Sequence, residues 1–270
     1  MNHFSERKLK LDDKSDETWV VWARQPVKKA VVFIHGYRGA AISTWTEFES
    51  QLPQRSKAKD YDLFFYGYNC YSSNTTAQGK LLCDFLSRLF ASPVNLVGIN
   101  LPCAANRTSA FGYKEVLLVG HSIGAIVCRR ALLFARDLKY NWMPQTKMVL
   151  FAPATNGAIL SELLKDLDSS WFKFIISGWR YYAPLVDEVA PASPSIEQLK
   201  QETIAAVQAG ADYLRATKVV VAEVERVVSN LRLRPVDPVP EAGPRGTTHT
   251  SICKPHSTFT YPVDQVEEVM

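Results

Sequence analysis

The pentapeptide Gly120-His121-Ser122-Ile123-Gly124 constrains the fold of this chain more than any other segment. It follows the apolar run Val116-Leu117-Leu118-Val119 and precedes a helix-like stretch over residues 125–134. A serine between two such glycines, entered from a strand and left through a helix, is typical of a nucleophile elbow. The turn is so tight that side chains at its two flanking positions would clash, which explains both glycines. We therefore expect the Ser122 hydroxyl on a sharp bend, pointing out of a sheet.

Continuous apolar runs alternate with helical patterns along the rest of the chain. The predicted strands are Trp19–Trp22, Ala30–Ile34, Leu63–Tyr66, Val116–Val119, Met148–Phe151 and Val219–Val221. Runs that are apolar throughout are typical of parallel strands that are covered on both faces. Helices are predicted over residues 76–90 and 123–138, the first from an apolar stripe at spacings of three and four. This alternation predicts an α/β fold with a mostly parallel central sheet and helices on both faces.

We expect residues 1–270 to form a single domain, because a chain of this length can bury a sizeable core. Residues 154–217 break the alternation with a long, mainly helical insertion. It is too long for a simple crossover and too apolar for a solvated loop, so we expect a cap or lid over the carboxyl edge of the sheet. Its aromatic residues, within 171–176 and 179–182, leave three alternatives open: core packing, an acyl pocket, or a membrane-binding face.

Charge and cysteine content exclude several classes of protein. The net charge is only +4, and no dense run of lysine and arginine is interleaved with aromatic residues, so nucleic acid is not expected as a partner. The five cysteines are an odd number at irregular spacing and include no C-x-x-C pair, which indicates neither a zinc site nor a redox motif. We expect no metal ion and no organic cofactor.

The sequence also carries signals about location. The first eight residues lack the apolar core of a signal peptide, and no uninterrupted apolar run reaches the length of a membrane span. Free thiols fit a reducing compartment. We therefore expect a soluble, cytoplasmic protein for which a membrane surface is not indicated as a partner.

A serine hydroxyl is a weak nucleophile, so Ser122 needs an adjacent base and a third group that orients the base. The chain has five histidines: His3, His35, His121, His249 and His256. His3 lies in an expected loose tail, His35 ends a strand, and the side chain of His121 cannot turn back onto Ser122. His249, in a C-terminal loop, is the predicted base, and His256 is the alternative.

The orienting acid is expected near the end of the strand that follows the insertion. Glu223 and Glu225 both lie there, and strand alternation cannot separate them because residues two apart share a face. Glu225 is favoured because it lies beyond the apolar run, with Glu223 as the alternative acid. Asp237 is a third candidate.

A tetrahedral intermediate requires two hydrogen-bond donors aimed at its negatively charged oxygen. The backbone N–H of Ile123 follows the nucleophile directly and opens the next helix, so it is the first predicted donor. The second is expected from the loop after His35 and Gly36, where glycine allows close approach of the backbone. The Tyr37 N–H is the predicted donor, and Arg38 is next in line.

These features occur in the order found in the α/β-hydrolase superfamily, and the chain resembles its lipase-like branch, which includes GPI inositol-deacylase-like and serine-active-site-containing esterases. The resemblance spans roughly residues 30–260. The segments that carry it are Phe33-Ile34-His35-Gly36-Tyr37, Gly120-His121-Ser122-Ile123-Gly124, Glu223-Val224-Glu225-Arg226-Val227-Val228 and His249-Thr250-Ser251-Ile252-Cys253-Lys254-Pro255. In that branch, the last two segments hold the catalytic acid and the catalytic histidine.

Two departures from the branch limit what the resemblance implies. Glutamate stands at the acid position, where aspartate is commoner. Residues 151–157 contain no histidine, whereas many relatives have a Thr-Pro-His-x-Gly type of segment there. A phospholipid substrate is therefore not carried over from the resemblance.

Residues and resemblance together predict a serine hydrolase that cleaves carboxylic esters through an acyl-enzyme, with Ser122, His249 and Glu225 as the catalytic set. The expected partner is a small-molecule or lipid ester. A lipase or phospholipase acting on lipid esters is the first alternative, and acyl transfer or amide hydrolysis would use the same groups. A non-catalytic binding protein that retains the fold is the alternative of a different class.

Overall fold

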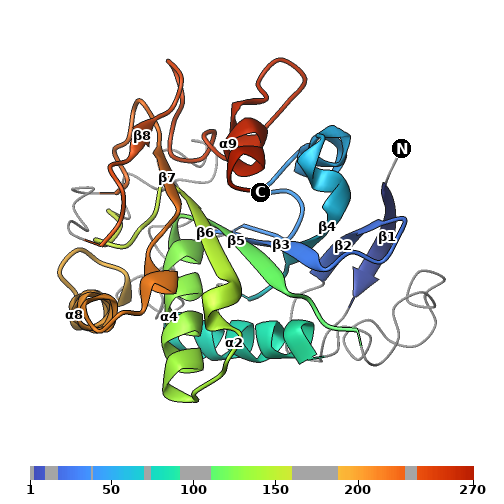
Figure 1. Cartoon of the computed structure of the whole chain (residues 1–270). Coiled ribbons are helices and arrows are strands. Elements are labelled where there is room, and N and C mark those ends of the chain that lie inside the picture. Colours follow the sequence, from blue (N-terminus) through green and yellow to red (C-terminus); the bar gives the residue numbers. More distant parts are fainter. Residues whose placement is uncertain are drawn as a thin grey trace.

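One sheet of eight strands runs through the molecule in the order β1-β2-β4-β3-β5-β6-β7-β8 (Figure 1). The computed structural model describes residues 3–9, 18–37, 39–69, 74–91, 111–159, 188–228 and 236–270. The strands are β1 (His3–Leu9), β2 (Thr18–Ala23), β3 (Lys29–Ile34), β4 (Tyr61–Tyr66), β5 (Glu115–His121), β6 (Thr146–Phe151), β7 (Lys218–Val221) and β8 (Glu241–Ala242). The run from β4 to β8 is parallel, and β1 and β2 add an antiparallel edge.

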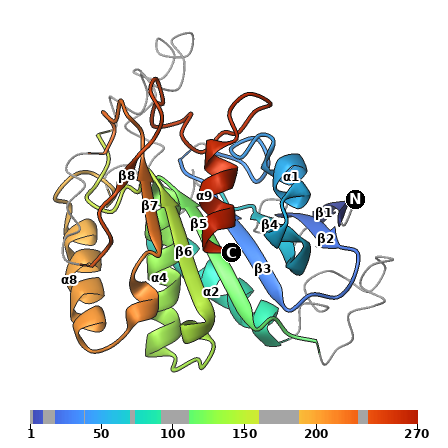
Figure 2. The same ribbon diagram turned by 45° about the horizontal axis from the view of Figure 1, so that its top comes forward.

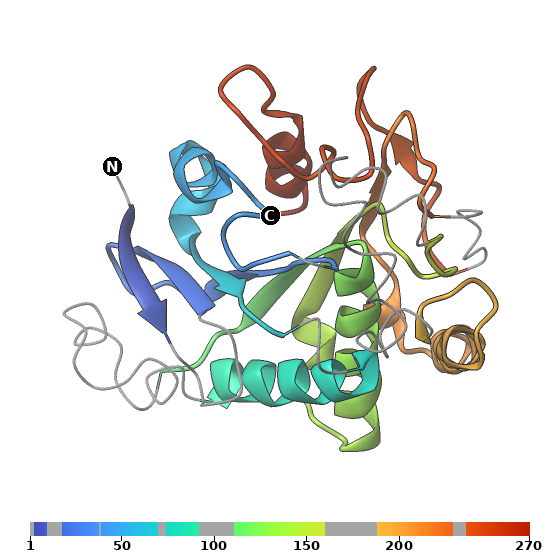
Figure 3. The same cartoon turned by 180° about the vertical axis from the view of Figure 1, so that it is seen from behind.

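Helices cover both faces of the sheet, as Figures 1 and 3 show. The α-helices are α1 (Phe48–Gln51), α2 (Thr75–Ala91), α4 (Ile123–Asp137), α8 (Pro194–Gln208) and α9 (Tyr261–Val269). Short 3₁₀ helices are η1 (Leu52–Gln54), η2 (Lys57–Asp60), η4 (Met143–Gln145) and η7 (Asp212–Leu214). α2, α4 and α8 pack on one face, whereas α1 and α9 pack on the other, where Figure 2 shows α9 in front of the strands.

The two apolar cores explain why the strands are apolar throughout. In β3, Val32 packs into the core beneath α2 and α4, and Val31 and Phe33 pack into the core beneath α1 and α9. Successive side chains of a strand point to opposite faces, so a strand between two helical layers buries every residue. The predicted α/β fold, with a mostly parallel sheet and helices on both faces, is confirmed.

The strand register brings several strand ends to one edge of the sheet. Ile34 of β3 pairs with Gly120 of β5, and His121 of β5 pairs with Phe151 of β6. Phe151 in turn pairs with Val220 of β7. Loops that follow these strands therefore begin side by side, at the carboxyl edge where open α/β sheets place their functional groups.

One detail of the sequence prediction was wrong, and two elements were missed. His3 lies in β1, which pairs with β2, instead of in a loose tail. The short strand β8 was not predicted from the sequence. The C-terminal helix α9 was not predicted, although Val263 and Val266 on it are fully buried.

The predicted cap over residues 154–217 is described only in part. Its helix α8 packs against α4 with buried Ile196 and Leu199, as a crossover helix between β6 and β7 does. Residues 160–187, which hold the aromatic segments, lie outside the described residues. The single domain and the cap therefore stay predictions.

A buried ion pair joins the helical layer to the segment before β8. The guanidinium of Arg129 on α4 contacts the carboxylate of Asp237, and both side chains are buried. Asp237 also accepts a hydrogen bond from the Ala216 N–H at 3.0 Å. A buried charge is stable only when it is paired, so this contact fixes Asp237 away from the carboxyl edge of the sheet.

Candidate active site

Ser122 lies on a strained turn between β5 and α4. Its φ of 53° and ψ of −120° fall in a region that residues other than glycine rarely adopt. Neighbouring backbone holds this conformation: the Ser122 N–H donates to Phe151 O at 3.0 Å, and Ser122 O accepts from Ala154 N at 3.1 Å. The strand–turn–helix context predicted for the pentapeptide is present, and the next strand of the sheet fixes the turn.

The glycine at the end of the turn is required by a neighbouring strand. A Cβ on Gly124 would lie 2.2 Å from Ile34 O and 2.6 Å from His35 O. Both atoms are backbone at the end of β3, which cannot move aside. Gly124 thus allows the start of α4 to press against β3, so the constraint arises from packing between elements as well as from the turn itself.

The structure brings Ser122, His249 and Glu225 into one chain of hydrogen bonds. His249 Nε2 lies 2.9 Å from Ser122 Oγ. On the other side of the ring, His249 Nδ1 lies 3.1 Å and 3.2 Å from the two carboxylate oxygens of Glu225. A carboxylate only accepts, so Nδ1 carries the proton and Nε2 is left to accept from the serine hydroxyl. Ser122 and the His249 side chain are each only 1% exposed.

Backbone amides hold Glu225 in place. Its Oε1 accepts from Val227 N at 3.0 Å and from Val228 N at 3.1 Å, and its side chain is only 6% exposed. Two N–H groups of its own turn therefore hold the carboxylate while it faces the imidazole.

The other candidate acids lie elsewhere. Glu223 is exposed and accepts from Gly246 N at 2.6 Å, and Asp237 is paired with Arg129. The assumption that Glu223 and Glu225 share one strand face was wrong, because β7 ends at Val221. The turn that follows sends the two side chains in different directions, so only Glu225 of the three meets His249.

The loop that carries His249 is anchored at several points. Val224 N donates to Thr247 O at 3.0 Å, which adds one bridge to the sheet beyond β7. Ile252 and Cys253 are fully buried after it. The alternative base, His256, is exposed and contacts Thr258 Oγ1 at 3.2 Å, away from Ser122.

Of the two predicted oxyanion donors, Ile123 follows Ser122 in the chain, and Tyr37 follows Gly36, which packs against the serine. Within the part of the chain that the structure describes, no acceptor meets the N–H of Ile123, the first residue of α4. Gly36 passes close to the serine, since a Cβ there would lie 2.9 Å from Ser122 Cβ. The Gly36 carbonyl accepts from Gly39 N and lies 2.9 Å from His35 Nδ1. In a trans peptide the next N–H points the opposite way, so these contacts orient the Tyr37 N–H. Arg38 lies outside the described residues.

Two further imidazoles are buried near this site. Burial lowers the pKa of His35 to about 4, and burial together with the nearby His249 lowers the pKa of His121 to about 3. His35 stacks on Tyr68 with ring centroids 4.1 Å apart. His121 Nε2 lies 2.9 Å from His249 O. Sequence reasoning placed His35 at the end of a strand and His121 at the second position of the elbow, and it missed these contacts because they join segments that are far apart in the chain.

Among the described residues, candidate metal ligands are not clustered and the cysteines are buried. No group of three or more histidine, cysteine or acidic side chains among them is arranged to hold a metal ion. Cys83, Cys128 and Cys253 are buried free thiols, and burial raises the pKa of Cys83 to about 11 and that of Cys253 to about 12.

In the part of the chain that the structure describes, no helix is both long enough and apolar enough to span a bilayer.

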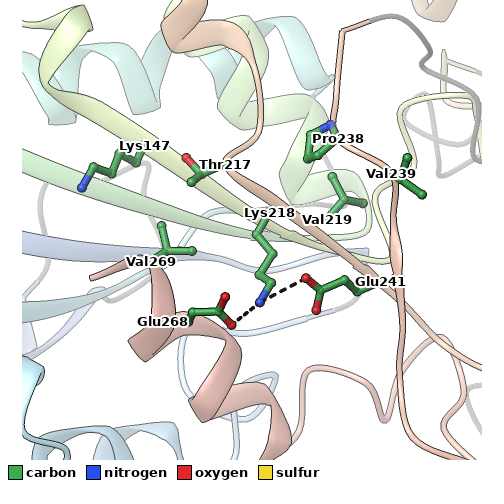
Figure 4. Close-up of a pocket in the computed structure, with 9 residues that line it drawn as sticks. All are labelled: Lys147, Thr217, Lys218, Val219, Pro238, Val239, Glu241, Glu268 and Val269. Carbon is green, nitrogen blue, oxygen red and sulfur yellow. Dashed lines mark hydrogen bonds and ion pairs between the residues drawn. The ribbon is translucent and has the colours of Figure 1, made fainter.

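A cleft of about 350 Å³ lies at the opposite edge of the sheet, beside the amino ends of β6 and β7, and Figure 4 draws the residues that line it. Its two lysines are already paired. Lys218 Nζ contacts Glu268 and lies 3.3 Å from Glu241, and Lys147 Nζ lies 3.4 Å from Glu115. The cleft contains none of the predicted site residues and offers no unpaired charge to a ligand.

Comparison with known proteins identifies the fold. No family model and no curated protein matches the sequence. Among solved structures, the mature form of a lipase from Bacillus licheniformis matches with a TM-score of 0.55 and 16% identity, over 97% of this chain and 95% of that one. A naproxen esterase (carboxylesterase NP) from Bacillus subtilis matches with a TM-score of 0.52 and 13% identity, over 98% and 91%. An esterase from Pyrococcus furiosus matches with a TM-score of 0.50 and 12% identity, over 99% and 90%.

These likenesses extend over nearly the whole of each chain, and the chain has the α/β-hydrolase fold. Identities this low show the fold alone. The narrower resemblance to GPI inositol-deacylase-like and serine-active-site-containing esterases stays a prediction.

The two neutral histidines make stability depend on pH. Both pKa values lie below the ordinary value of 6.5, so the unfolded chain binds protons more tightly than the folded one. Their contribution is fully present above pH ~6.5 and is lost as the pH falls towards the folded-state values. Between pH 7.5 and 5.0, we expect the free energy of unfolding to fall by about 2 kcal/mol for each histidine. Urea unfolding followed by circular dichroism measures this, and His35→Gln should reduce the pH dependence by about half. Equal stability at both pH values would contradict the prediction.

Proposed function

We propose that this protein is a serine hydrolase that cleaves carboxylic esters through an acyl-enzyme on Ser122. The observation that carries the proposal is the hydrogen-bonded chain from Ser122 through His249 to Glu225. A nucleophile within hydrogen-bond reach of a base, which a third group orients, is the arrangement that activates serine. The class of the substrate is supported by the solved structures of the same fold, which are described as a lipase and two esterases.

The chemistry follows from the tautomer of His249. As Ser122 Oγ attacks the ester carbonyl, its proton passes to His249 Nε2, and Glu225 stabilises the positive imidazolium. Collapse of the tetrahedral intermediate breaks the bond to the alcohol, which leaves with the proton from Nε2. Water then attacks the acyl-enzyme, giving its proton to the same nitrogen, and that proton returns to Ser122 as the carboxylic acid leaves.

The negative oxygen of each intermediate needs donors that are already in position. We assign this role to the N–H groups of Ile123 and Tyr37. The first opens a helix of 15 residues, whose N-terminus favours negative charge. The second belongs to the peptide whose carbonyl is held by Gly39 and by His35.

The assignment of the nucleophile is tested with Ser122→Ala. We expect turnover of p-nitrophenyl butyrate to fall by about 10⁴-fold or more, because no other group can form the acyl-enzyme. A fluorophosphonate probe should label the wild-type protein on Ser122 and leave the variant unlabelled. The variant should keep the circular dichroism spectrum of the wild type. Activity near the wild-type level in Ser122→Ala would remove the assignment. A folded wild-type protein that no serine-directed probe labels would favour the non-catalytic binding protein.

The choice of acid is tested by a matched pair of substitutions two residues apart. Glu225→Gln removes the charge beside the imidazole. Its amide can also donate to Nδ1, which would leave the proton on the nitrogen that faces Ser122, so kcat should fall by about 10²- to 10⁴-fold. Glu223→Gln changes an exposed side chain and should leave kcat within about twofold. Steady-state kinetics on the same ester gives both values. Equal losses in the two variants, or a loss in Glu223→Gln alone, would overturn Glu225 as the acid.

Exposed apolar residues beside the site favour an ester with an apolar portion. Val224, which is 41% exposed, directly precedes Glu225, and Ile159, which is 36% exposed, donates its N–H to Val227 O at 2.7 Å. Exposed aliphatic side chains at a ligand site gain free energy when an alkyl chain covers them. This observation is also what favours the second candidate, a lipase acting on lipid esters.

A series of p-nitrophenyl esters from acetate to palmitate separates the two candidates. We expect kcat/KM to rise about two- to fourfold per added methylene until the apolar surface is covered, following the transfer free energy of a CH₂ group. Ile159→Ser combined with Val224→Ser should flatten the series while leaving acetate unchanged. A rise that continues to palmitate favours the lipase, and a maximum at a shorter chain favours the esterase. No dependence on chain length would contradict the apolar site.

A further inference from the structure

His121 connects the strand that carries Ser122 to the loop that carries His249. It is the last residue of β5 and directly precedes the serine. Its ring is buried, with 6% of the residue exposed, and points at the C-terminal loop instead of at Ser122. Nε2 lies 2.9 Å from the backbone oxygen of His249. Because a carbonyl oxygen only accepts, Nε2 of His121 carries the proton and donates it to this bond.

This bond closes a ring of contacts around the nucleophile and the base. Ser122 is joined to His121 by the chain, His121 is joined to His249 O by the bond above, and the His249 ring returns to Ser122 Oγ at 2.9 Å. The rings of His121 and His249 also touch, with centroids 5.1 Å apart. Both the backbone and the side chain of His249 are therefore bonded to residues at the end of β5, the backbone to His121 and the ring to Ser122.

We infer that His121 is a positioning residue that holds the His249 backbone at the distance at which the imidazole reaches Ser122 Oγ. The inference rests on the proposed function, and deepens it by assigning a role to the second residue of the elbow. His249 lies on a loop without helix or strand, and the bonds of its neighbours Thr247 and Thr248 anchor that loop to Val224 and Ser251 but do not hold His249 O itself. A displacement of about 1 Å in such a group can reduce the rate by about a hundredfold.

The neutral state of His121 suits this role. Burial keeps the pKa of His121 well below neutral, and the titratable and charged groups that add to it are His249, Lys254 and His35. A neutral ring donates from Nε2 without adding a positive charge beside His249. A cation there would oppose the imidazolium that His249 must become during each transfer of the proton.

Three substitutions at this position separate positioning from packing. His121→Leu removes the donor. His121→Asn keeps a polar amide, but its nitrogen lies one bond too close to the backbone to reach His249 O. His121→Gln places an amide nitrogen as far along the side chain as Nε2. We expect kcat per active site to fall about ten- to hundredfold in the Leu and Asn variants, with KM within about twofold, and to stay within about threefold in the Gln variant.

The measurement counts active sites by stoichiometric labelling with a fluorophosphonate, so that loss of folded protein is not mistaken for loss of kcat. Melting temperatures are recorded for every variant. His256→Leu is the matched control, because that histidine is exposed and lies outside the site, and it should leave every value unchanged. Lower melting temperatures with unchanged kcat per site in the Leu and Asn variants would overturn the inference, as would a Gln variant as slow as the Leu variant.

Failure of this inference differs from failure of the proposed function. If the wild type neither turns over esters nor reacts with the probe, the proposed function fails and with it the inference. If the wild type is active and Ser122→Ala is not, while all three His121 variants match the wild type per active site, only the inference fails.

Discussion

The close contact between the start of α4 and the end of β3 determines where Ser122 lies. Gly124 fits against the carbonyl oxygens of Ile34 and His35, where no larger residue could be placed. From the other side, the Ser122 N–H bonds to Phe151 O of β6. The strained backbone of the serine is therefore fixed by two neighbouring strands, and the parallel register that aligns them is a property of the whole sheet. Such strain persists only where the surrounding structure over-determines it.

Around that fixed serine, three imidazoles are buried in different environments. His35 bonds to the Gly36 carbonyl and His121 bonds to the His249 carbonyl, so both contact neutral backbone groups. Only the ring of His249 meets a carboxylate. This difference in partners matters because a positive imidazolium is stabilised by a facing negative charge and penalised by burial without one. The fold thus gives one histidine a carboxylate partner and each of the other two a backbone carbonyl.

Much of the fold could be predicted from the sequence because its signals are local. The apolar runs of β3, β5 and β6 and the stripe of α2 follow from period and hydrophobicity alone. The antiparallel edge and β8 could not be found this way, since pairing at an edge depends on which strand lies next to it. Strand alternation could not distinguish Glu223 from Glu225, and only position beyond the apolar run favoured Glu225, because the directions of the two side chains depend on where β7 ends and how the next turn is bonded. The contact between His121 and His249 O could not be predicted, because it joins residues 128 apart in the chain.

The sequence by itself determined the α/β class, the elbow at Ser122 and the short set of residues able to act with it. Those features depend on residue type and on spacing within a few positions, which a chain carries before it folds. Only the tertiary structure decided which acid faces His249, which histidines contact backbone carbonyls, and that Asp237 is paired with Arg129. Each of these is a contact between segments far apart in the chain. The direction of each side chain depends on where a strand ends and how the next turn is bonded, and both are fixed only when the sheet is assembled.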